Sequence, residues 1–400
     1  MRTLTAGKSR GLVLQWGHKR FYLDTVLLSA SMGILVLGYI MVASASLHLG
    51  EKLANDSFYF PKHQLVHVFM GLAAAVFVAS RPLAFWEKSS QVLFLLGLFL
   101  LVVVLVPGLG KSVNGSVRWL SILGLRIQVS EVFKLISVVY MATFITHRLQ
   151  LVRTSWFGMI RPMAMLGVAC VLLLREPDFG SAAVIVAVAM GMLYLAGARL
   201  VQFGILLAVA GAGACFLVFT SAYRLKRVLS FSDPWADPLN TGFQLTQALI
   251  AFGRGEWVGV GLGSSVQKLF FLPEAHTDFL FSVIGEELGL MGACVVIVLF
   301  SVVVWRAFVI GRQAERVDKP FAAYIAYGLG IWFGLQAFIN MGVNMGMLPT
   351  KGLTLPLMSY GGGSMIVMCS ALALLFRVRS EVMEASGSIS RERAAWSRVS

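Results

Sequence analysis

A small set of charged residues lies within or beside long apolar stretches of this 400-residue chain. An ionisable group at membrane depth is costly and usually has a function, so these residues are the first candidates for chemistry. They form three groups: Arg126, Glu131 and Lys134; Arg175, Glu176 and Asp178; Asp278, Glu286 and Glu287. Carboxylates of this kind can act as general bases, and the cations can hold a phosphate group.

Asp278 ends the sequence His276-Thr277-Asp278, directly before a long apolar stretch. A lone carboxylate at a membrane surface can accept a proton from a sugar hydroxyl, as a general base does. The alternative is structural, with Thr277 as the N-cap of the next helix and Asp278 in its first turn. The residues alone leave both interpretations open.

Arg126, Glu131 and Lys134 flank the start of another apolar stretch. Glu131 and Lys134 are three residues apart, so a helix brings them onto one face. They predict either a structural ion pair with a snorkelling arginine or a cationic site for phosphate or pyrophosphate. Arginine suits the second role because its planar guanidinium can hold phosphate through two hydrogen bonds.

The remaining charged residues interrupt or open apolar stretches. In Arg175-Glu176-Pro177-Asp178, the proline prevents a continuous helix. Broken helices at membrane depth usually line a cavity, although a tight external turn explains the pattern equally well. Glu286 and Glu287 are adjacent and point in different directions on a helix, which suits packing within a bundle or pairing with a cation.

The sequence lacks the familiar metal-binding and nucleophile patterns: no HExxH, GxSxG or Cys/His zinc spacing occurs. The glycines of 259–263 (GVGLG) fit neither a dinucleotide loop nor a Walker motif, so a flexible loop is expected there. Residues 360–364 (YGGGS) predict a close backbone approach to a helix or a substrate. The four cysteines lie singly in apolar stretches and are interpreted as core residues.

The apolar stretches predict an all-α polytopic membrane protein. Hydrophobic residues make up 58% of the chain and charged residues 13%, against about 45–50% and 25% in soluble domains. This balance excludes a cytosolic enzyme, a disordered chain and a secreted disulfide scaffold. At about 20 residues for each crossing, ten transmembrane helices are expected. Their ranges are 25–43, 64–80, 89–107, 132–146, 163–174, 179–198, 200–222, 279–305, 321–348 and 353–376.

An even number of spans places both termini on one side of the membrane. With the termini in the cytoplasm, 20 of the 33 Lys and Arg residues lie inside, as the positive-inside rule favours. The expected organisation is a cytoplasmic segment 1–24, a single ten-helix domain 25–376 and a cytoplasmic tail 377–400 that is disordered or lies on the surface. The first span is expected to remain as an uncleaved anchor, since its apolar run exceeds that of a signal peptide.

A long segment without a span, residues 223–278, is expected outside the membrane between the seventh and eighth helices. It is too long for an ordinary connection, which indicates a function, and residues 245–252 could form an amphipathic helix at the interface. Its cations would gather an anionic lipid-linked substrate or simply be solvated. They are Arg224, Lys226, Arg227, Arg254 and Lys268. At this point a transporter and an enzyme for lipid-linked substrates are nearly equally favoured.

Four segments resemble the SEDS family (shape, elongation, division and sporulation). They are RIQVSEVFK at 126–134, EPDFGS at 176–181, the long segment 242–292, and GMLPTKGLTLPLMSYGGGS at 346–364. They follow the family order over nearly the whole chain, and SSVQKLFFLPEAHTDF looks like the cell-division branch rather than the elongation branch. One departure is Val129, where the family usually has proline. The helix entry should survive, because proline suits a helix start but is not required.

The resemblance implies a peptidoglycan glycosyltransferase of the cytoplasmic membrane, an inverting enzyme that polymerises lipid II for the division septum. It implies a class B penicillin-binding transpeptidase of the division type and other divisome regulators as partners, with no nucleic acid. The family's catalytic aspartate maps onto Asp278. Substrate binding is expected for Arg126, Glu131, Lys134, Glu176, Asp178, Lys268, His276, Lys351 and Ser359. The resemblance implies no definite cofactor, and a divalent cation, Mg²⁺ or Mn²⁺, would suit a leaving pyrophosphate.

Three alternatives are a lipid II flippase, the elongation-type polymerase and a non-catalytic scaffold that recruits the transpeptidase. A flippase needs a polar path through the membrane but has no need for a base outside it. The expected position of Asp278 at the outer surface therefore favours the enzyme.

Overall fold

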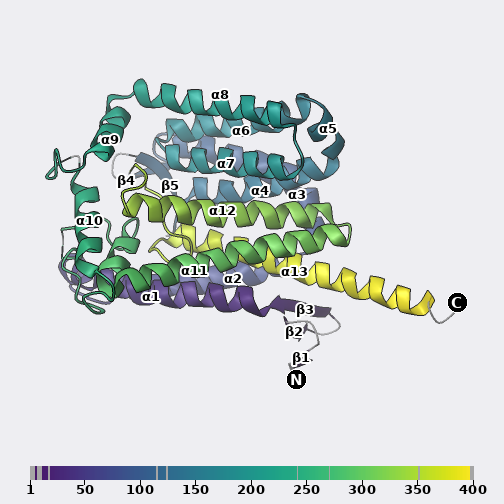
Figure 1. The fold of residues 1–400 in the computed structure, drawn as a ribbon, viewed down its shortest axis with the longest axis horizontal. Coiled ribbons are helices and arrows are strands. Elements are labelled where there is room, and N and C mark those ends of the chain that lie inside the picture. Colours follow the sequence, from purple (N-terminus) through teal and green to yellow (C-terminus); the bar gives the residue numbers. More distant parts are fainter. Residues whose placement is uncertain are drawn as a thin grey trace.

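The computed structural model is a bundle of long helices that run side by side, with smaller elements at both ends (Figure 1). It describes residues 5–6, 11–16, 19–113, 116–122, 125–240, 242–269, 271–349 and 352–396. The helices are α1 (Thr25–Ala54), α2 (Tyr59–Ser80), α3 (Leu83–Leu105), α4 (Val129–His147), α5 (Leu149–Thr154), α6 (Phe157–Arg175), α7 (Phe179–Leu195), α8 (Leu200–Phe219), α9 (Ala222–Ser232), α10 (Phe243–Gly255), α11 (Leu280–Arg316), α12 (Pro320–Asn344) and α13 (Gly362–Trp396).

Two small antiparallel sheets accompany the helices, which the all-α prediction did not include. One has the order β1 (Thr5–Ala6), β2 (Gly11–Trp16), β3 (Lys19–Asp24) and leads into α1. The other has the order β4 (Gly110–Val113), β5 (Ser116–Ile122), β6 (Leu125–Gln128) and connects α3 to α4. These strands are short and lie next to much stronger apolar signals, so periodicity in the sequence gives little indication of them.

The structure confirms a mostly helical protein with many apolar helices. In the described part of the chain, eight helices are long and apolar enough to cross a membrane: α1, α2, α3, α4, α6, α8, α11 and α12. Helix α7 is a shorter apolar helix of 17 residues. It packs beside α6, so the fifth and sixth expected spans are two separate helices joined by a turn at 176–178.

The last helix differs from the prediction at both ends. It begins at Gly362 rather than at residue 353, and it continues to Trp396 instead of giving way to a loose tail at 377. Its polar part is held at the end of the bundle, because Ser380 Oγ accepts a hydrogen bond from the Tyr22 amide at 3.2 Å. Arg379 also lies 3.6 Å from a carboxylate oxygen of Asp24.

Helices α4 and α12 form the centre of the bundle. In each, 72% of the most apolar 18 residues are buried, whereas the figure for α8 is 6%. Helix α12 packs against α4, α7, α11 and α13, and α8 lies at the edge on α7 and α9 (Figure 1). Polar side chains on α4 and α12 are therefore shielded from lipid by their neighbours.

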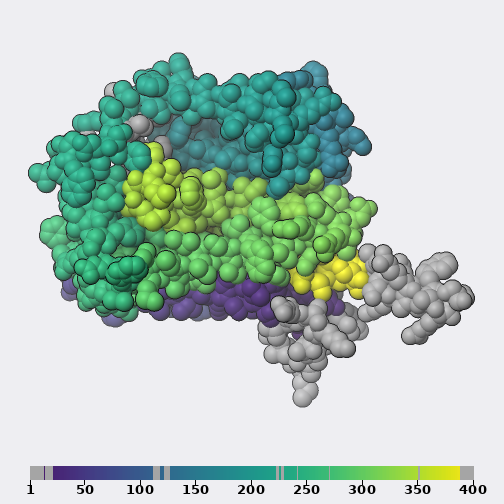
Figure 2. Space-filling model, viewed as in Figure 1, coloured from purple at the N-terminus to yellow at the C-terminus, as the bar shows by residue number. Residues whose placement is uncertain are grey.

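The chain between α8 and α11 forms the end of the bundle opposite β3 and the last turns of α13 (Figure 1). Figure 2 shows the atoms of this segment covering that end of the bundle. Helix α10 confirms the helix expected at 245–252. The tail end and the segment 223–278 therefore lie at opposite ends of the molecule.

The GVGLG loop, expected to be flexible, is docked into a kink of α11. The kink lies at Gly289, which has a φ of 64°, and the Val260 amide donates to the Glu286 carbonyl there at 3.0 Å. A β-carbon at Gly259 would lie 2.2 Å from the Glu287 carbonyl oxygen. Glycine is required at this position because the two backbones touch.

Candidate active site

Asp278 lies in a turn directly before α11, at the end of the bundle that carries α9 and α10. The helix begins at Leu280 with Phe279 in the N-cap position. The structural alternative, with Thr277 as the N-cap and Asp278 in the first turn, is therefore wrong. The Thr277 hydroxyl instead donates to a carboxylate oxygen of Glu274 at 2.8 Å. This hydrogen bond joins two residues of the same turn rather than capping the helix.

The backbone of Asp278 is held by two amide side chains of α12. Nδ2 of Asn340 and Nδ2 of Asn344 each donate to the Asp278 carbonyl at 2.9 Å. Asn340 Nδ2 also donates to the Leu353 carbonyl at 2.6 Å. A β-carbon at Gly352 would lie 3.1 Å from Oδ2 of Asp278. The backbone of residue 278 is thus fixed, and its half-buried carboxylate lies beside the irregular chain that follows α12.

Lys134 forms a buried ion pair with Glu131 on α4. Its Nζ lies 2.8 Å from Glu131 Oε1 and donates to Gln336 Oε1, also at 2.8 Å. The Trp332 ring centre lies 5.7 Å from the same nitrogen. Lys134 is 1% exposed and Glu131 3%, so the ammonium is enclosed in this structure, and its role in substrate binding stays a prediction.

Three amide side chains of α12 connect Lys134 to Asp278. Gln336, Asn340 and Asn344 are spaced by four residues and project from one helix face. Gln336 Nε2 donates to the Thr354 carbonyl at 3.1 Å, next to the residue that Asn340 holds. These three residues were not among the predicted site residues, because uncharged amides do not stand out in a search for charged groups within apolar stretches. Amides repeated every four residues within an apolar span were the signal that could have found them.

Asp178 joins the starts of α7 and α4. Its Oδ1 accepts the Ser181 amide at 3.2 Å, which caps α7. Its Oδ2 accepts the hydroxyls of Ser130 and Ser181, both at 2.8 Å, and Nε2 of Gln128 at 3.2 Å. The carboxylate is engaged in fixing two helix ends, and its expected contact with substrate is untested.

Glu176 is buried in the same turn, and neither carboxyl oxygen has a hydrogen-bond partner among the described residues. Burial, together with the Asp178 carboxylate, raises the pKa of Glu176 to about 8, against an opposing effect of Arg118. The neutral acid is favoured because a buried charge without a partner is costly. Glu176 is therefore expected to hold its proton at neutral pH.

A pH dependence of stability follows from Glu176. Its folded pKa of about 8 lies above the ordinary value of 4.5, so between these values the folded state binds more protons than the unfolded state. Stability should therefore fall as the pH rises through this window. The measurement is thermal unfolding at several pH values. The stability of Glu176→Gln should not show the part of the decline with rising pH that Glu176 causes. The exposed acid variant Glu256→Gln should follow the wild type, and a Glu176→Gln profile parallel to wild type would contradict the assignment.

Lys268 points into the protein, where it lies 2.7 Å from Oε1 of Glu287 and donates to the Ser44 hydroxyl at 3.0 Å. The adjacent Glu286 accepts the Val266 amide at 3.0 Å. Both glutamates are fully buried. They attach residues 265–268 to α11 and α1, and the role of Lys268 in substrate binding stays a prediction.

His276 and Ser359 lie in the same region of the fold. The centre of the His276 ring lies 4.9 Å from the centre of the Phe60 ring and 5.4 Å from that of the Tyr360 ring. Burial lowers the pKa of His276, against an opposing effect of Glu274, so the ring is neutral at neutral pH. The Ser359 hydroxyl accepts the amide of Leu355 at 2.9 Å.

The other expected site residues are described only in part. Lys351 lies outside the described residues. The backbone of Arg126 belongs to β6, opposite Ser121. The cations whose side chains are outside the description are Arg126, Arg224 and Arg227. Lys226 is exposed, and Arg254 lies 3.6 Å from a carboxylate oxygen of Glu286.

The described site residues can carry out acid–base chemistry. Asp278 is a half-buried carboxylate whose backbone is fixed, so its position can be defined against a hydroxyl group of a substrate. Among the described residues, no group of three or more His, Cys, Asp or Glu side chains is arranged to hold a metal ion.

Comparison with known proteins shows which sequences and structures this chain is similar to. The profile of the FtsW/RodA/SpoVE family, described as cell cycle protein, matches residues 25–384. A probable peptidoglycan glycosyltransferase FtsW of Methylococcus capsulatus is 67% identical over 383 residues, which cover 96% of each chain. A protein of the same name from Methylomonas methanica is 60% identical over 365 residues, 91% of this chain and 94% of that one.

Two solved structures have a similar fold. A chain from the structure "Structural coordination of polymerization and crosslinking by a peptidoglycan synthase complex" has a TM-score of 0.71 and 26% identity, covering 90% of this chain and 98% of that chain. The rod shape determining protein RodA of Thermus thermophilus has a TM-score of 0.65 and 24% identity, covering 89% and 96% of the two chains. The second similarity concerns the fold alone.

Proposed function

The chain belongs to the FtsW/RodA/SpoVE family of cell cycle proteins and acts as a peptidoglycan glycosyltransferase; we propose that it polymerises lipid II for the division septum with Asp278 as general base. The observation that carries the assignment of the base is the fixed backbone of Asp278, whose carbonyl accepts from two amides of α12. A base must be held within reach of the hydroxyl that it deprotonates.

The proposed topology has ten membrane crossings, with both termini in the cytoplasm and residues 223–278 outside. Helices α7 and α13 supply the two crossings beyond the eight long apolar helices. The excess of Lys and Arg in the inside segments supports this orientation. Asp278 then lies at the outer face of the cytoplasmic membrane, where a lipid-linked sugar is accessible.

In the proposed reaction, Asp278 accepts the proton of the 4-hydroxyl on the terminal sugar of the acceptor. The oxygen forms a bond to the anomeric carbon of the donor as the bond from that carbon to undecaprenyl pyrophosphate breaks. Undecaprenyl pyrophosphate leaves with the electron pair, and the single displacement inverts the anomeric centre. One base is sufficient, because a pyrophosphate leaving group requires charge neutralisation rather than a strong acid.

The proposed cations for the leaving group are Arg126 and Lys134. Arg126 lies in β6, just before α4, and a guanidinium can bind phosphate through two hydrogen bonds. Lys134 is held by Glu131 and Gln336, so it can contact a phosphate only by exchanging one of these partners. Contacts to the substrate are also proposed for the remaining expected residues: Glu176, Asp178, Lys268, His276, Lys351 and Ser359.

The proposed partner is a class B penicillin-binding transpeptidase of the division type, which would crosslink the new strands at the septum. The similar solved chain with a TM-score of 0.71 belongs to a peptidoglycan synthase complex that couples polymerization and crosslinking. This similarity supports the proposal that the present chain works in a complex with a crosslinking enzyme.

The test is polymerisation of labelled lipid II by the purified full chain together with its cognate transpeptidase. Glycan strands should form, and they should still form when the transpeptidase active site is blocked by penicillin. If the intact complex instead moved lipid II across vesicle membranes without making polymer, the flippase would replace the polymerase.

A further inference from the structure

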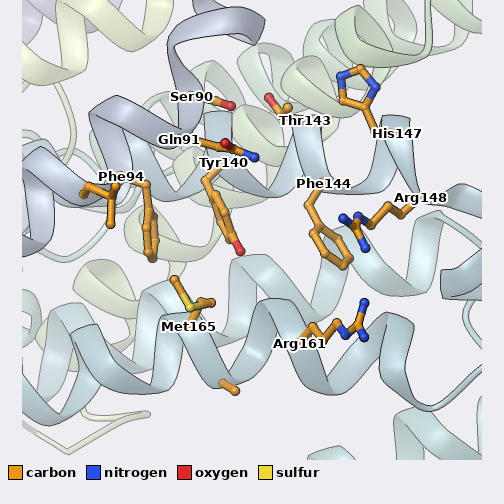
Figure 3. Close-up of a pocket in the computed structure, with 12 residues that line it drawn as sticks. Ser90, Gln91, Phe94, Tyr140, Thr143, Phe144, His147, Arg148, Arg161 and Met165 are labelled. Carbon is orange, nitrogen blue, oxygen red and sulfur yellow. The ribbon is translucent and has the colours of Figure 1, made fainter.

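A cavity of about 590 Å³ lies between α3, α4 and α6, at the opposite end of α4 from Glu131 (Figure 3). Its walls are mainly apolar and include Phe94, Leu95, Phe144 and Met165. Leu95 is 61% exposed and Met165 39%, so the cavity opens on the side of the bundle. Its volume falls within the range of about 300–1,000 Å³ that is typical of ligand sites.

Two arginines lie at one end of this cavity. Arg148 follows the last turn of α4, and Arg161 lies near the start of α6. Figure 3 shows both side chains beside the Phe144 ring. Within the described part of the chain, neither forms an ion pair with a carboxylate. The acid Glu87 contacts His147 instead, at 3.2 Å.

A buried hydroxyl also lines the cavity. Ser90 is 1% exposed, and its Oγ has no hydrogen-bond partner among the described residues. The hydroxyl of Thr143, another lining residue, donates to the Val139 carbonyl of its own helix at 3.0 Å. Ser90 therefore offers a polar contact to whatever fills the cavity, since a buried hydroxyl without a partner is unfavourable.

We propose that this cavity binds one anionic glycerophospholipid of the cytoplasmic leaflet. Its phosphate lies between Arg148 and Arg161, and an acyl chain lies against Phe94, Leu95 and Met165. Cations above an apolar channel match an amphiphile with an anionic head. A soluble phosphate has no need for the apolar walls, and a neutral lipid or an apolar helix of a partner leaves both arginines unmatched. The assignment to the cytoplasmic leaflet rests on the proposed topology.

The test is native mass spectrometry of the delipidated full-length protein in detergent, titrated with dioleoyl phosphatidylglycerol or with dioleoyl phosphatidylcholine. Phosphatidylglycerol should bind to the wild type at one site more tightly than phosphatidylcholine. Arg148→Gln/Arg161→Gln should weaken it about 30-fold, as expected for losing two cations that each contribute about 1 kcal/mol at a membrane surface. Ala164→Trp should also weaken binding, because it fills the channel from an exposed wall position.

The matched control is Arg81→Gln/Arg312→Gln, which removes the same charge from exposed positions that do not line the cavity. It should bind phosphatidylglycerol as the wild type does. The proposal is overturned if both lipids bind equally, if the Arg148/Arg161 variant binds like the wild type, or if the control loses as much affinity as that variant. Unchanged binding to Ala164→Trp would also overturn it, because the lipid would then sit elsewhere.

Discussion

Asp278→Asn should lower the rate of lipid II polymerisation by about 10²–10⁴-fold, the usual contribution of a positioned general base. Asparagine has the same shape but cannot accept the proton of the attacking hydroxyl. The fold should survive, since Asn340 and Asn344 bind the backbone carbonyl of residue 278 rather than its side chain. The measurement is the initial rate of strand formation from labelled lipid II by the purified complex.

The matched control for this variant is Glu256→Gln, an exposed acid in the same segment of the chain. It removes one carboxylate without touching the proposed base and should polymerise at the wild-type rate. Thermal unfolding and retention of the transpeptidase should be unchanged in both variants. An Asp278→Asn complex that makes polymer at the wild-type rate would show that another group accepts the proton.

Lys134→Met should destabilise the protein by about 3–5 kcal/mol, because it leaves the buried carboxylate of Glu131 without its cation. The effect should extend to the site. Gln336 Oε1 loses one of its two donors, Lys134 and Trp332. Gln336 Nε2 binds the carbonyl of Thr354, which follows Leu353 in the chain, and Asn340 binds the carbonyls of both Leu353 and Asp278. Thermal unfolding in detergent measures the loss, and the exposed variant Lys62→Met is the control for removing a lysine from an ion pair.

Adding Glu131→Gln to Lys134→Met separates the two roles of the ion pair. The double variant has no uncompensated buried charge, so much of the lost stability should return. Polymerisation should stay low, because the proposed contact of the ammonium with the leaving pyrophosphate is still missing. If the double variant recovered both stability and polymerisation, Lys134 would be a structural residue and Arg126 would remain as the proposed phosphate ligand.

Asp278 illustrates what can be predicted from the sequence and what requires the structure. The position of Asp278 before an apolar span could be read from the sequence, whereas its place outside α11 could not. Helix starts depend on which backbone amides find partners, and here the chain turns at 274–279 before the helix begins. The glycines of 259–263 resembled a flexible loop because nothing local indicates that α11 opens at Gly289 to receive them.

Composition and local patterns were sufficient to predict the membrane class, the apolar helices, the family and the charged residues worth testing. These depend on local composition and on spacing, because a bilayer requires continuous apolar runs and a helix places residues three or four apart on one face. Which polar groups are in contact, in contrast, depends on the packing of the helices. Lys134 lies 202 residues from Gln336, and Lys268 lies 224 residues from Ser44. Contacts at such separations depend on how the helices pack, and no local pattern encodes them.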